Sequence, residues 1–303
     1  EISKRESQNL FFSPLSAETV LAFVQSGCKD ATAQEIRIAL HLPDDKEKVD
    51  IGVKNFLPPL KINTNYTLLS ANKVYIKDVF EIKEDFKTTA IEVYHADLEN
   101  INFSKNAEAA QIINKWVEEQ TNSKIQNLIA SCELTNETRA IIINTLYFKA
   151  NWVYRFLLRY TAKRDFYKCA SDILQVDTMF MPSRSKCFFN YSECEKLNAQ
   201  FLELPFKGEG ASMVIVLPKE KEGLATLENE IESVFSPRQF YRTLVDITLY
   251  SAKPFDDKKA DLSVIAGDKG DLVINNVIQK TFIDVNEDGV EAAAVSGVNK
   301  CSG

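Results

Sequence analysis

Hydrophobic residues recur three or four positions apart in two long stretches of the chain. The first is SPLSAETVLAFVQSGCKDATAQEIRIAL, residues 13–40, which opens with a Ser-Pro pair typical of a helix start. The second is NAEAAQIINKWVEEQTNSKI, residues 106–125, in which Ile113, Trp116 and Val117 share one face at helical spacing. This periodicity predicts amphipathic helices that cover a core.

Three other stretches have the composition and spacing of β-strands. TRAIIINTLYFKANW, residues 138–152, is an apolar run rich in β-branched and aromatic residues, typical of a central strand buried on both faces. FLELPFKGEGASMVIVLP, residues 201–218, predicts two strands joined by a glycine-rich turn, and LVINNVIQKTFIDV, residues 272–285, predicts another strand. Because helices and strands do not alternate strictly, the pattern favours an α+β fold.

The composition is that of a globular protein with a large core. The chain has 303 residues, of which 45% are hydrophobic and 26% charged. A net charge of −7, without any basic run, argues against a nucleic-acid partner. No stretch approaches the roughly 20 apolar residues that span a bilayer, so no membrane association is expected. The opening residues, EISKRESQNLFF, have no signal-peptide pattern.

The cysteines and the glycosylation sequons bear on the compartment. Six cysteines, at positions 28, 132, 169, 187, 194 and 301, follow neither a metal-ligand spacing nor a dense disulfide framework, so we expect isolated small apolar side chains. Four N-x-[ST] sequons favour a secreted, extracellular glycoprotein, with a cytoplasmic location as the alternative. The acceptors are Asn65, Asn102, Asn136 and Asn190.

Residues 281–297, TFIDVNEDGVEAAAVSG, contain a partial match to a calcium-binding loop. An EF-hand loop needs a bidentate Glu at its twelfth position, which here is Val295, and it needs helices on both sides, whereas the preceding sequence is strand-like. We therefore expect no metal at this place. The match is confined to four residues, Asp284, Asn286, Asp288 and Gly289.

Enzyme motifs are absent from the sequence. The two histidines, His41 and His95, lie in no recognisable motif. The G-x-S-x-G, P-loop, G-x-G-x-x-G and H-E-x-x-H patterns do not occur. The residues thus give no positive reason to expect catalysis or a cofactor.

The segment GVEAAAVSG, residues 289–297, consists mainly of small residues and contains no proline. A flexible loop or a poor helix is one interpretation of it. As a strand, it would instead have two distinct faces, and Gly289 would supply a backbone pivot. One face would hold Val290, Ala292, Ala294 and Ser296, and the other would hold Glu291, Ala293 and Val295.

Six motifs, in order along the chain, resemble those of the serpins, a family of serine protease inhibitors. NLFFSPLSAETVLA resembles the start of the family's second helix, and LLSANKVYI resembles the segment that follows it. INKWVEEQTNSKI resembles the helix that lies across the main sheet. INTLYFKANW and LELPFKGEGASMVIVLP resemble strand motifs, and FIDVNEDGVEAAAVSG resembles the hinge of the reactive loop. The resemblance is closest to inhibitory serpins of insects.

The resemblance implies a serpin fold with three β-sheets, eight to nine helices and a mobile reactive loop. Ser13, Ser16 and Asn144 would form the shutter beneath the middle of the large sheet. Trp152 would lie at the breach, where the loop first enters that sheet. The hinge would comprise Glu287, Asp288, Gly289, Val290, Glu291, Ala292, Ala293 and Ala294.

The resemblance also implies a mechanism. A protease cuts the loop, which inserts as an extra strand before the acyl-enzyme hydrolyses, and the protease is distorted; the inhibitor supplies no catalytic residue. Insertion requires small, uncharged inward side chains, because an unpaired buried charge costs several kcal/mol or more. Val290 and its neighbours on that face meet this demand, so we expect an inhibitor, with a non-inhibitory binding or storage protein as the alternative. Glu291, on the other face, is expected to tolerate substitution.

The target protease is less well specified by the sequence. The family's usual spacing from the hinge glycine reaches Gly303, and Ser302, Cys301 and Lys300 are further candidates for the reactive bond. Small residues there suggest an elastase-like serine protease or a cysteine protease, whereas Lys300 would suit a trypsin-like one. Residues 53–67 hold only two lysines and two prolines, so we expect no heparin-type cofactor. The protein is expected to be a monomer.

The chain is expected to form a single domain, residues 1–303. Relative to the family pattern it lacks part of the first helix, a segment near residues 250–255, and the strands that follow the reactive loop. Its end near the expected reactive bond predicts the large fragment of a cut serpin, with residues 290 to about 302 inserted as a strand and the C-terminal fragment still bound. A chain with an intact loop is the alternative.

Overall fold

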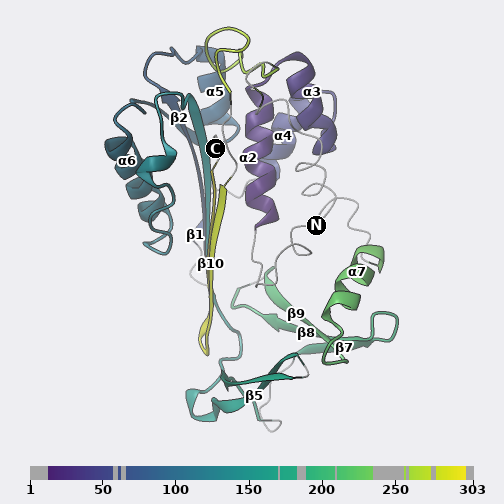
Figure 1. Cartoon of the computed structure of the whole chain (residues 1–303). Coiled ribbons are helices and arrows are strands. Elements are labelled where there is room, and N and C mark those ends of the chain that lie inside the picture. Colours follow the sequence, from purple (N-terminus) through teal and green to yellow (C-terminus); the bar gives the residue numbers. More distant parts are fainter. Residues whose placement is uncertain are drawn as a thin grey trace.

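The computed structural model contains three β-sheets flanked by helices (Figure 1). This arrangement confirms the α+β class predicted from the sequence. The structure describes residues 13–56, 61–62, 66–169, 171–182, 189–208, 210–234, 256, 259–273 and 278–297.

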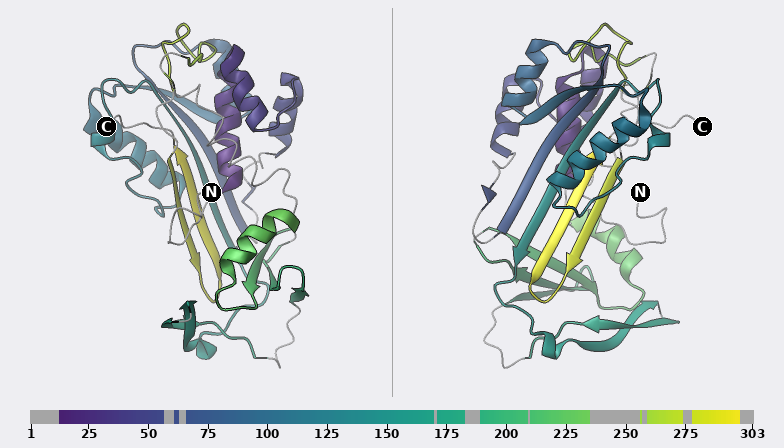
Figure 2. Two further views of the ribbon diagram at one scale, coloured as in Figure 1. Left: turned by 45° about the vertical axis from the view of Figure 1, so that its right-hand side comes forward. Right: turned by 90° about the vertical axis from the view of Figure 1, so that its left-hand side faces the viewer.

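The largest sheet has six strands and forms the long axis of the molecule (Figure 2). Its strand order is β1-β2-β4-β11-β10, and β3 pairs with β2 outside this path. The β2–β3 pair is parallel and the others are antiparallel. The strands are β1 (Lys61–Ile62), β2 (Tyr66–Lys77), β3 (Ala96–Ile101), β4 (Ala140–Asn151), β10 (Ile278–Val285) and β11 (Gly289–Gly297).

The central strand β4 is covered on both faces, because α2 (Pro14–Ser26) and α6 (Asn106–Gln120) lie on opposite sides of the sheet (Figure 2). Successive strand residues point to opposite faces. Ile142 therefore belongs to the core cluster on the α2 side, whereas Ile141 and Ile143 belong to the cluster beneath α6. This two-sided burial explains the uninterrupted apolar run that the sequence shows here.

Helices surround the upper part of the sheet (Figure 1). α2 begins at Pro14, and proline is favoured at a first helical position because its missing N–H would have no intrahelical partner there. In the described part of the chain there are six α-helices and two 3-10 helices, and none of the helices is long and apolar enough to cross a membrane. The remaining ones are α3 (Asp30–Ala39), α4 (Lys46–Phe56), α5 (Glu84–Glu92), α7 (Leu224–Val234), Ser131–Glu133 and Leu158–Tyr160.

Two smaller antiparallel sheets lie at the other end of the molecule from α3 and α5 (Figure 1). The turn between two of their strands contains Gly208 and Gly210 at φ 94° and 95°, a conformation that other residues rarely adopt, so the predicted glycine-rich turn is confirmed. One sheet consists of β5 (Ala162–Cys169) and β6 (Asp172–Thr178), and the other of β7 (Asn190–Cys194), β8 (Ala199–Pro205) and β9 (Ser212–Pro218).

Candidate functional site: the hinge strand and its surroundings

The small-residue segment singled out in the sequence is a central strand of the main sheet. β11 lies between β4 and β10 and pairs antiparallel with both (Figure 2). Val290 is opposite Ala150 on one side and Val285 on the other, and Ser296 is opposite Asn144. The inserted strand predicted from the sequence is thus present over residues 289–297. Its predicted continuation lies outside the described residues, together with the reactive-bond candidates Lys300, Cys301, Ser302 and Gly303.

A tight turn joins β10 to β11. The backbone N–H of Asn286 donates to the carbonyl oxygen of Gly289 over 3.0 Å. The side-chain oxygen of Asn286 accepts from the N–H groups of Asp288 (3.1 Å) and Gly289 (3.2 Å), and its Nδ2 donates to Asp284 (3.2 Å). The residues that match half of a calcium loop therefore close a hairpin. Among the residues that the structure describes, no group of three or more His, Cys, Asp or Glu could hold a metal ion.

Gly289 is required by close packing in the inserted strand. A Cβ atom added at this position would lie 2.0 Å from the carbonyl oxygen of Ala150 and 2.8 Å from the Cα of Asn151. Both atoms belong to the backbone of β4, which cannot move aside without breaking the sheet. The role predicted for this glycine was a backbone pivot; the structure adds a steric reason that applies while β11 is in the sheet.

Val290 packs in an apolar core cluster at the start of β11. Val290 is only 6% exposed, and its core cluster also contains Ala150, Trp152, Leu204 and Phe206. Burying such a side chain contributes about 1.5–3 kcal/mol. Valine therefore stabilises the inserted strand as well as fitting it.

Trp152, which the resemblance to serpins places at the breach, contacts the start of the inserted strand. Its ring stacks on Phe206 with centroids 4.8 Å apart. Its indole Nε1–H donates to the carbonyl oxygen of Asn286 (2.9 Å), and its backbone N–H donates to that of Asp288 (2.9 Å). The carboxylate of Glu287 accepts from the Thr161 hydroxyl over 2.7 Å. The hairpin turn is thus held to the end of β4 by both backbone and side chain.

Glu291 contradicts the expectation that its side of the strand is permissive. The residue is 8% exposed and lies on the same face of β11 as Ala293, which packs in the core cluster beneath α6. The hydroxyl of Tyr147 donates to its Oε1 (2.6 Å), while Lys124 and Lys149 lie 3.1 and 3.8 Å from its Oε2. A buried carboxylate with a partner on each oxygen cannot be exchanged freely for a cation, because the replacement would face two lysines.

The ionisation of this cluster follows its contacts. Burial alone would raise the pKa of Glu291, but the hydrogen bonds from Tyr147 and Lys124 and the charge of Lys149 hold that pKa below its ordinary value. Burial, followed by the hydrogen bond to Glu291, raises the pKa of Tyr147 to about 12. At neutral pH the carboxylate is therefore ionised and the phenol is protonated, which is the pairing that their hydrogen bond requires.

Asn144, which the resemblance to serpins assigns to the shutter, lies in a buried chain of side-chain amides. Its Nδ2 donates to the side-chain oxygen of Asn72 over 2.7 Å, and Asn72 donates in turn to the carbonyl oxygen of Tyr94 over 2.6 Å. This buried chain of amides ties β4 to β2 directly opposite Ser296 of the inserted strand. Ser13 lies just before α2, where its carbonyl oxygen accepts from Ala17, and the side chain of Ser16 lies outside the described part.

Three of the four sequon asparagines are described, and all three are exposed. Asn102 accepts from the N–H of Ser104, and Asn136 accepts through its side-chain oxygen from Lys77 and Ser104. Asn190 donates through its amide nitrogen to Glu203. Of the cysteines, Cys28, Cys132 and Cys194 are free thiols. The remaining predicted acceptor, Asn65, is outside the described residues.

The sequence reasoning missed the partners of Glu291. Tyr147 and Lys149 lie within the motif INTLYFKANW, and Lys124 lies within INKWVEEQTNSKI, but both motifs were interpreted only as structural elements. The signal that could have found them is the register. Once β11 is placed against β4, Glu291 falls opposite Lys149 and Ala293 falls opposite Tyr147.

These features define a class of protein in which the small-residue hinge of a loop occupies the middle of the protein's own main sheet. The comparisons with known proteins agree. The chain matches the family described as Serpin (serine protease inhibitor) over residues 1–245 and 242–303. The chain belongs to the serpin family, and the three-sheet fold expected from the resemblance is that of its relatives.

Relatives and solved structures support this assignment over nearly the whole chain. Antichymotrypsin-2 of Bombyx mori is 31% identical over 318 residues, covering 97% of this chain and 83% of that protein. The structure of Serpin48 of the insect Tenebrio molitor is similar at a TM-score of 0.85 and 41% identity, covering 100% of this chain and 94% of that one. The structure of cleaved Serpin 42Da has a TM-score of 0.85 and 27% identity, with coverage of 98% and 84%. Membership of this family supports protease inhibition as the general function.

Proposed function

We propose that this protein inhibits proteases as a suicide substrate, by inserting its cut reactive loop into the main sheet. The observation that carries the proposal is the position of β11, in register between β4 and β10. The side chains of β11 suit that position, since Val290, Ala293 and Ala294 are small or apolar and are buried. A loop that could not insert would have no reason to match both neighbouring strands in this way. The protein itself contributes no catalytic residue to the reaction.

The target is a serine protease or a cysteine protease whose primary pocket accepts the residue before the reactive bond. Small residues, Gly303, Ser302 or Cys301, suit an elastase-like or papain-type enzyme, and Lys300 suits a trypsin-like one. Relatives named antichymotrypsin and antitrypsin share about the same identity with this chain, 31% each. Overall similarity therefore favours neither specificity, and the residue at the cut must be found directly.

The inserted strand favours the loop-cut state with a bound C-terminal fragment. The structure of cleaved Serpin 42Da is among those that resemble this chain. The strand β9 supports a bound fragment, because Val214, Ile215 and Leu217 are exposed apolar side chains on it. Additional strands covering these residues would remove that apolar surface from water. We infer that the strands following the reactive loop supply this cover.

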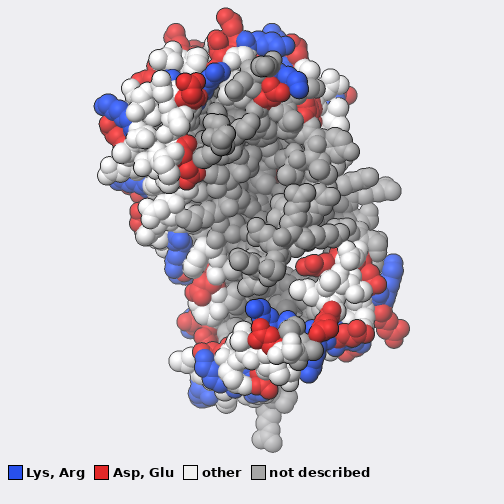
Figure 3. All heavy atoms as spheres, in the orientation of Figure 1, with Lys and Arg blue, Asp and Glu red and all other residues white. Residues whose placement is uncertain are grey.

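We propose that the protein is a monomeric, secreted glycoprotein that needs no polyanion. Asn102, Asn136 and Asn190 are accessible to glycosylation. Lysine and arginine are interspersed with aspartate and glutamate on the described surface in Figure 3, rather than gathered into a basic patch. Together with the net charge of −7, this distribution disfavours heparin. If glycosidase treatment leaves the mass of the secreted protein unchanged, the proposed glycosylation is wrong. Salt-sensitive retention on a heparin column would contradict the proposal that no polyanion binds.

Incubation with a panel of proteases followed by denaturing electrophoresis tests the proposed function. Elastase-like, trypsin-like, chymotrypsin-like and papain-type enzymes should each be mixed with the protein at equimolar ratio. A band at the summed mass of inhibitor and protease is expected for at least one of them, because the acyl-enzyme is trapped. Sequencing the released fragment then identifies the reactive bond. Cleavage with every enzyme and without any such band would instead identify a non-inhibitory serpin.

A further inference from the structure

Glu291 lies in a carboxylate dock formed by three side chains on the α6 side of the main sheet. We define the dock as Tyr147, Lys149 and Lys124. The Tyr147 hydroxyl contacts Oε1 at 2.6 Å, and the two lysines contact Oε2 at 3.1 and 3.8 Å. Each oxygen thus has its own donors. A pairing of this kind offsets the desolvation that burial imposes on a carboxylate.

The dock is assembled from separate elements that meet at the inserted strand. Tyr147 and Lys149 come from β4, and Lys124 comes from the segment that follows α6. Asn122 and Ser123 have positive φ values of 50° and 60°, and this left-handed backbone brings the chain back beneath the helix. The Lys124 ammonium also lies 5.3 Å from the ring centroid of Phe282 on β10. The lysine therefore contacts both β11, through Glu291, and the neighbouring strand β10.

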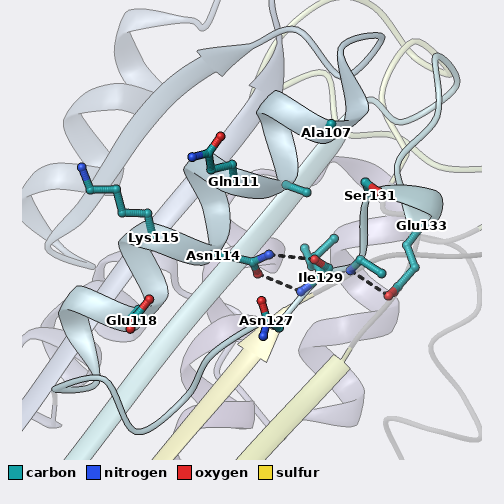
Figure 4. A pocket seen from close by; sticks show the side chains of 11 residues that line it. Ala107, Gln111, Asn114, Lys115, Glu118, Asn127, Ile129, Ser131 and Glu133 are labelled. Carbon is teal, nitrogen blue, oxygen red and sulfur yellow. Dashed lines mark hydrogen bonds between the residues drawn. The ribbon is translucent and has the colours of Figure 1, made fainter.

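The segment that carries Lys124 is held against α6. Figure 4 shows Asn114 of α6 facing this segment, with its side chain donating to the carbonyl oxygen of Ile129 over 2.8 Å and accepting from the Ile129 N–H over 2.9 Å. Thr121, fully buried, donates to Val117 and accepts from Ile125. These contacts fix both ends of the segment 121–129. Lys124 is thereby held over the sheet independently of Glu291.

The register of β11 depends on which face receives the carboxylate. A one-residue slip would exchange the two faces of the strand. Glu291 would then enter the apolar cluster of Trp152 and Phe206 and would lose its contacts with Tyr147, Lys124 and Lys149. On the correct face its neighbours across the sheet are Lys149 on β4 and Asp284 on β10. The charge of Lys149 and the hydrogen bond from Tyr147 offset the repulsion between Glu291 and the exposed Asp284.

We propose that Glu291 is a positioning residue for loop insertion, and that the dock captures its carboxylate to fix the register and favour the inserted state. This inference rests on the proposed trapping mechanism. Glu291 is among the first residues of the strand to enter the sheet, so capture occurs early. The dock is suited to a carboxylate on a side chain as long as that of glutamate. Before insertion the carboxylate is in solvent, and it then contributes nothing to the stability of the uncut protein.

Substitutions that remove one atom or one charge test the dock. Glu291→Gln keeps the size of the side chain and removes its charge, and Tyr147→Phe removes only the hydroxyl. Lys124→Met removes a cation, and Lys115→Met is its matched control, since Lys115 is an exposed lysine on α6 that faces Glu119 at 3.9 Å. Each variant is assayed for stoichiometry of inhibition and for association rate. Thermal unfolding is measured for the uncut and the loop-cut forms.

Glu291→Gln and Lys124→Met should raise the stoichiometry and slow insertion roughly tenfold, the scale expected for losing a hydrogen bond to a charged group. Association with the protease and the unfolding of the uncut protein should be unchanged. Lys115→Met should behave as wild type in every assay. The double variant Glu291→Gln/Tyr147→Phe should cost less than the sum of its single changes, because the first removes the charge and the second removes the donor of the same hydrogen bond. The charge-swapped double variant Glu291→Lys/Lys124→Glu should inhibit better than either of its single changes, because it restores an ion pair between the two positions.

Two results would overturn the inference. One is a Glu291→Gln variant that traps protease at wild-type stoichiometry although wild type itself traps normally; the dock would then be wrong and the proposed function would stand. The other is strict additivity in the double variant. If wild type traps no protease, the proposed function fails, and the loop-cut form still tests the dock. In that arm, equal unfolding temperatures for cut wild type and cut Glu291→Gln would overturn it.

Discussion

The two faces of β11 enter the sheet by different physical means. On one face, Val290 fills an apolar pocket beside Trp152 and Phe206, where the gain comes from removing hydrocarbon from water. On the other, Glu291 carries a charge beneath the segment after α6, where the gain depends on meeting Tyr147 and Lys124. The comparison teaches that an inserting strand need not be apolar throughout. Apolar packing on the Val290 face is non-directional. The hydrogen bond and ion pairs of Glu291 on the other face are satisfied in only one register.

The largest expected effect is at the apolar face. Val290→Arg should leave the uncut protein within about 0.5 kcal/mol of wild type, as is usual for an exposed position. It should slow insertion severely, because a guanidinium without a partner costs on the order of several kcal/mol to bury. The protease then deacylates, and the inhibitor becomes a substrate. The stoichiometry of inhibition measures this outcome.

Val79→Arg is the matched control for this change, since Val79 is 70% exposed in the turn that follows β2. It should inhibit like wild type. Trapping near one to one by Val290→Arg would show that the apolar face does not limit insertion, and the contrast between the two faces would have to be abandoned.

The next largest effect is expected on the stability of the loop-cut form when Gly289, the first residue of β11, is substituted. Gly289→Ala would place a Cβ 2.0 Å from the carbonyl oxygen of Ala150, so the loop-cut form should lose about 2 kcal/mol or more, the scale of strain in an overpacked site. The matched control is Gly52→Ala on α4, where nothing lies within 4 Å of the new Cβ and helix propensity should add about 0.5–1 kcal/mol. Chemical denaturation of the cut and uncut forms compares the two. Equal loss in both forms of Gly289→Ala would mean that its role precedes insertion.

A smaller effect is expected from pH, which should change the stability contributed by the charged face and not that contributed by the apolar face. Glu291 has its pKa lowered in the inserted state, so its contribution is present above its ordinary pKa of about 4.3 and is lost as the pH falls through the lowered value. The groups around it are Tyr147, Lys124, Lys149 and the exposed Asp284. The difference in unfolding free energy between loop-cut wild type and loop-cut Glu291→Gln should therefore shrink as the pH is lowered from 7 to 3. A difference that stays constant over this range would show that the carboxylate is not held as an anion.

The smallest effect is expected at the breach. Trp152→Phe removes the Nε1–H that donates to Asn286 over 2.9 Å and keeps an aromatic ring against Phe206. The loop-cut form should lose about 1 kcal/mol, since Asn286 is exposed and water can replace the lost donor at its carbonyl oxygen. Trp116→Phe on α6 is the matched control, and it should change stability less because its ring is only partly buried. Thermal unfolding of the cut forms measures both, and a Trp116 effect equal to that of Trp152 would argue against a special role for the breach.

Local signals were enough to predict the elements around β11. The apolar run of 138–152 and the helical spacing of 106–125 became β4 and α6, because side chains buried on two faces or on one face leave distinct periods in a sequence. The alternation within 289–297 also predicted which residues share a face. That prediction holds where the side chains are described: Val290 and Ala293 lie in different clusters.

The residues of the hinge already indicate that it is small, that it alternates between two faces and that glycine opens it. The burial of Glu291 and its three partners follow only from the three-dimensional arrangement. Lys124 is far from Glu291 along the chain, and their contact depends on a strand register together with a left-handed turn after α6. Periodicity reports which face a residue occupies, because it is a local property of the backbone. It cannot report what covers that face, because the cover comes from distant segments whose placement is fixed by packing.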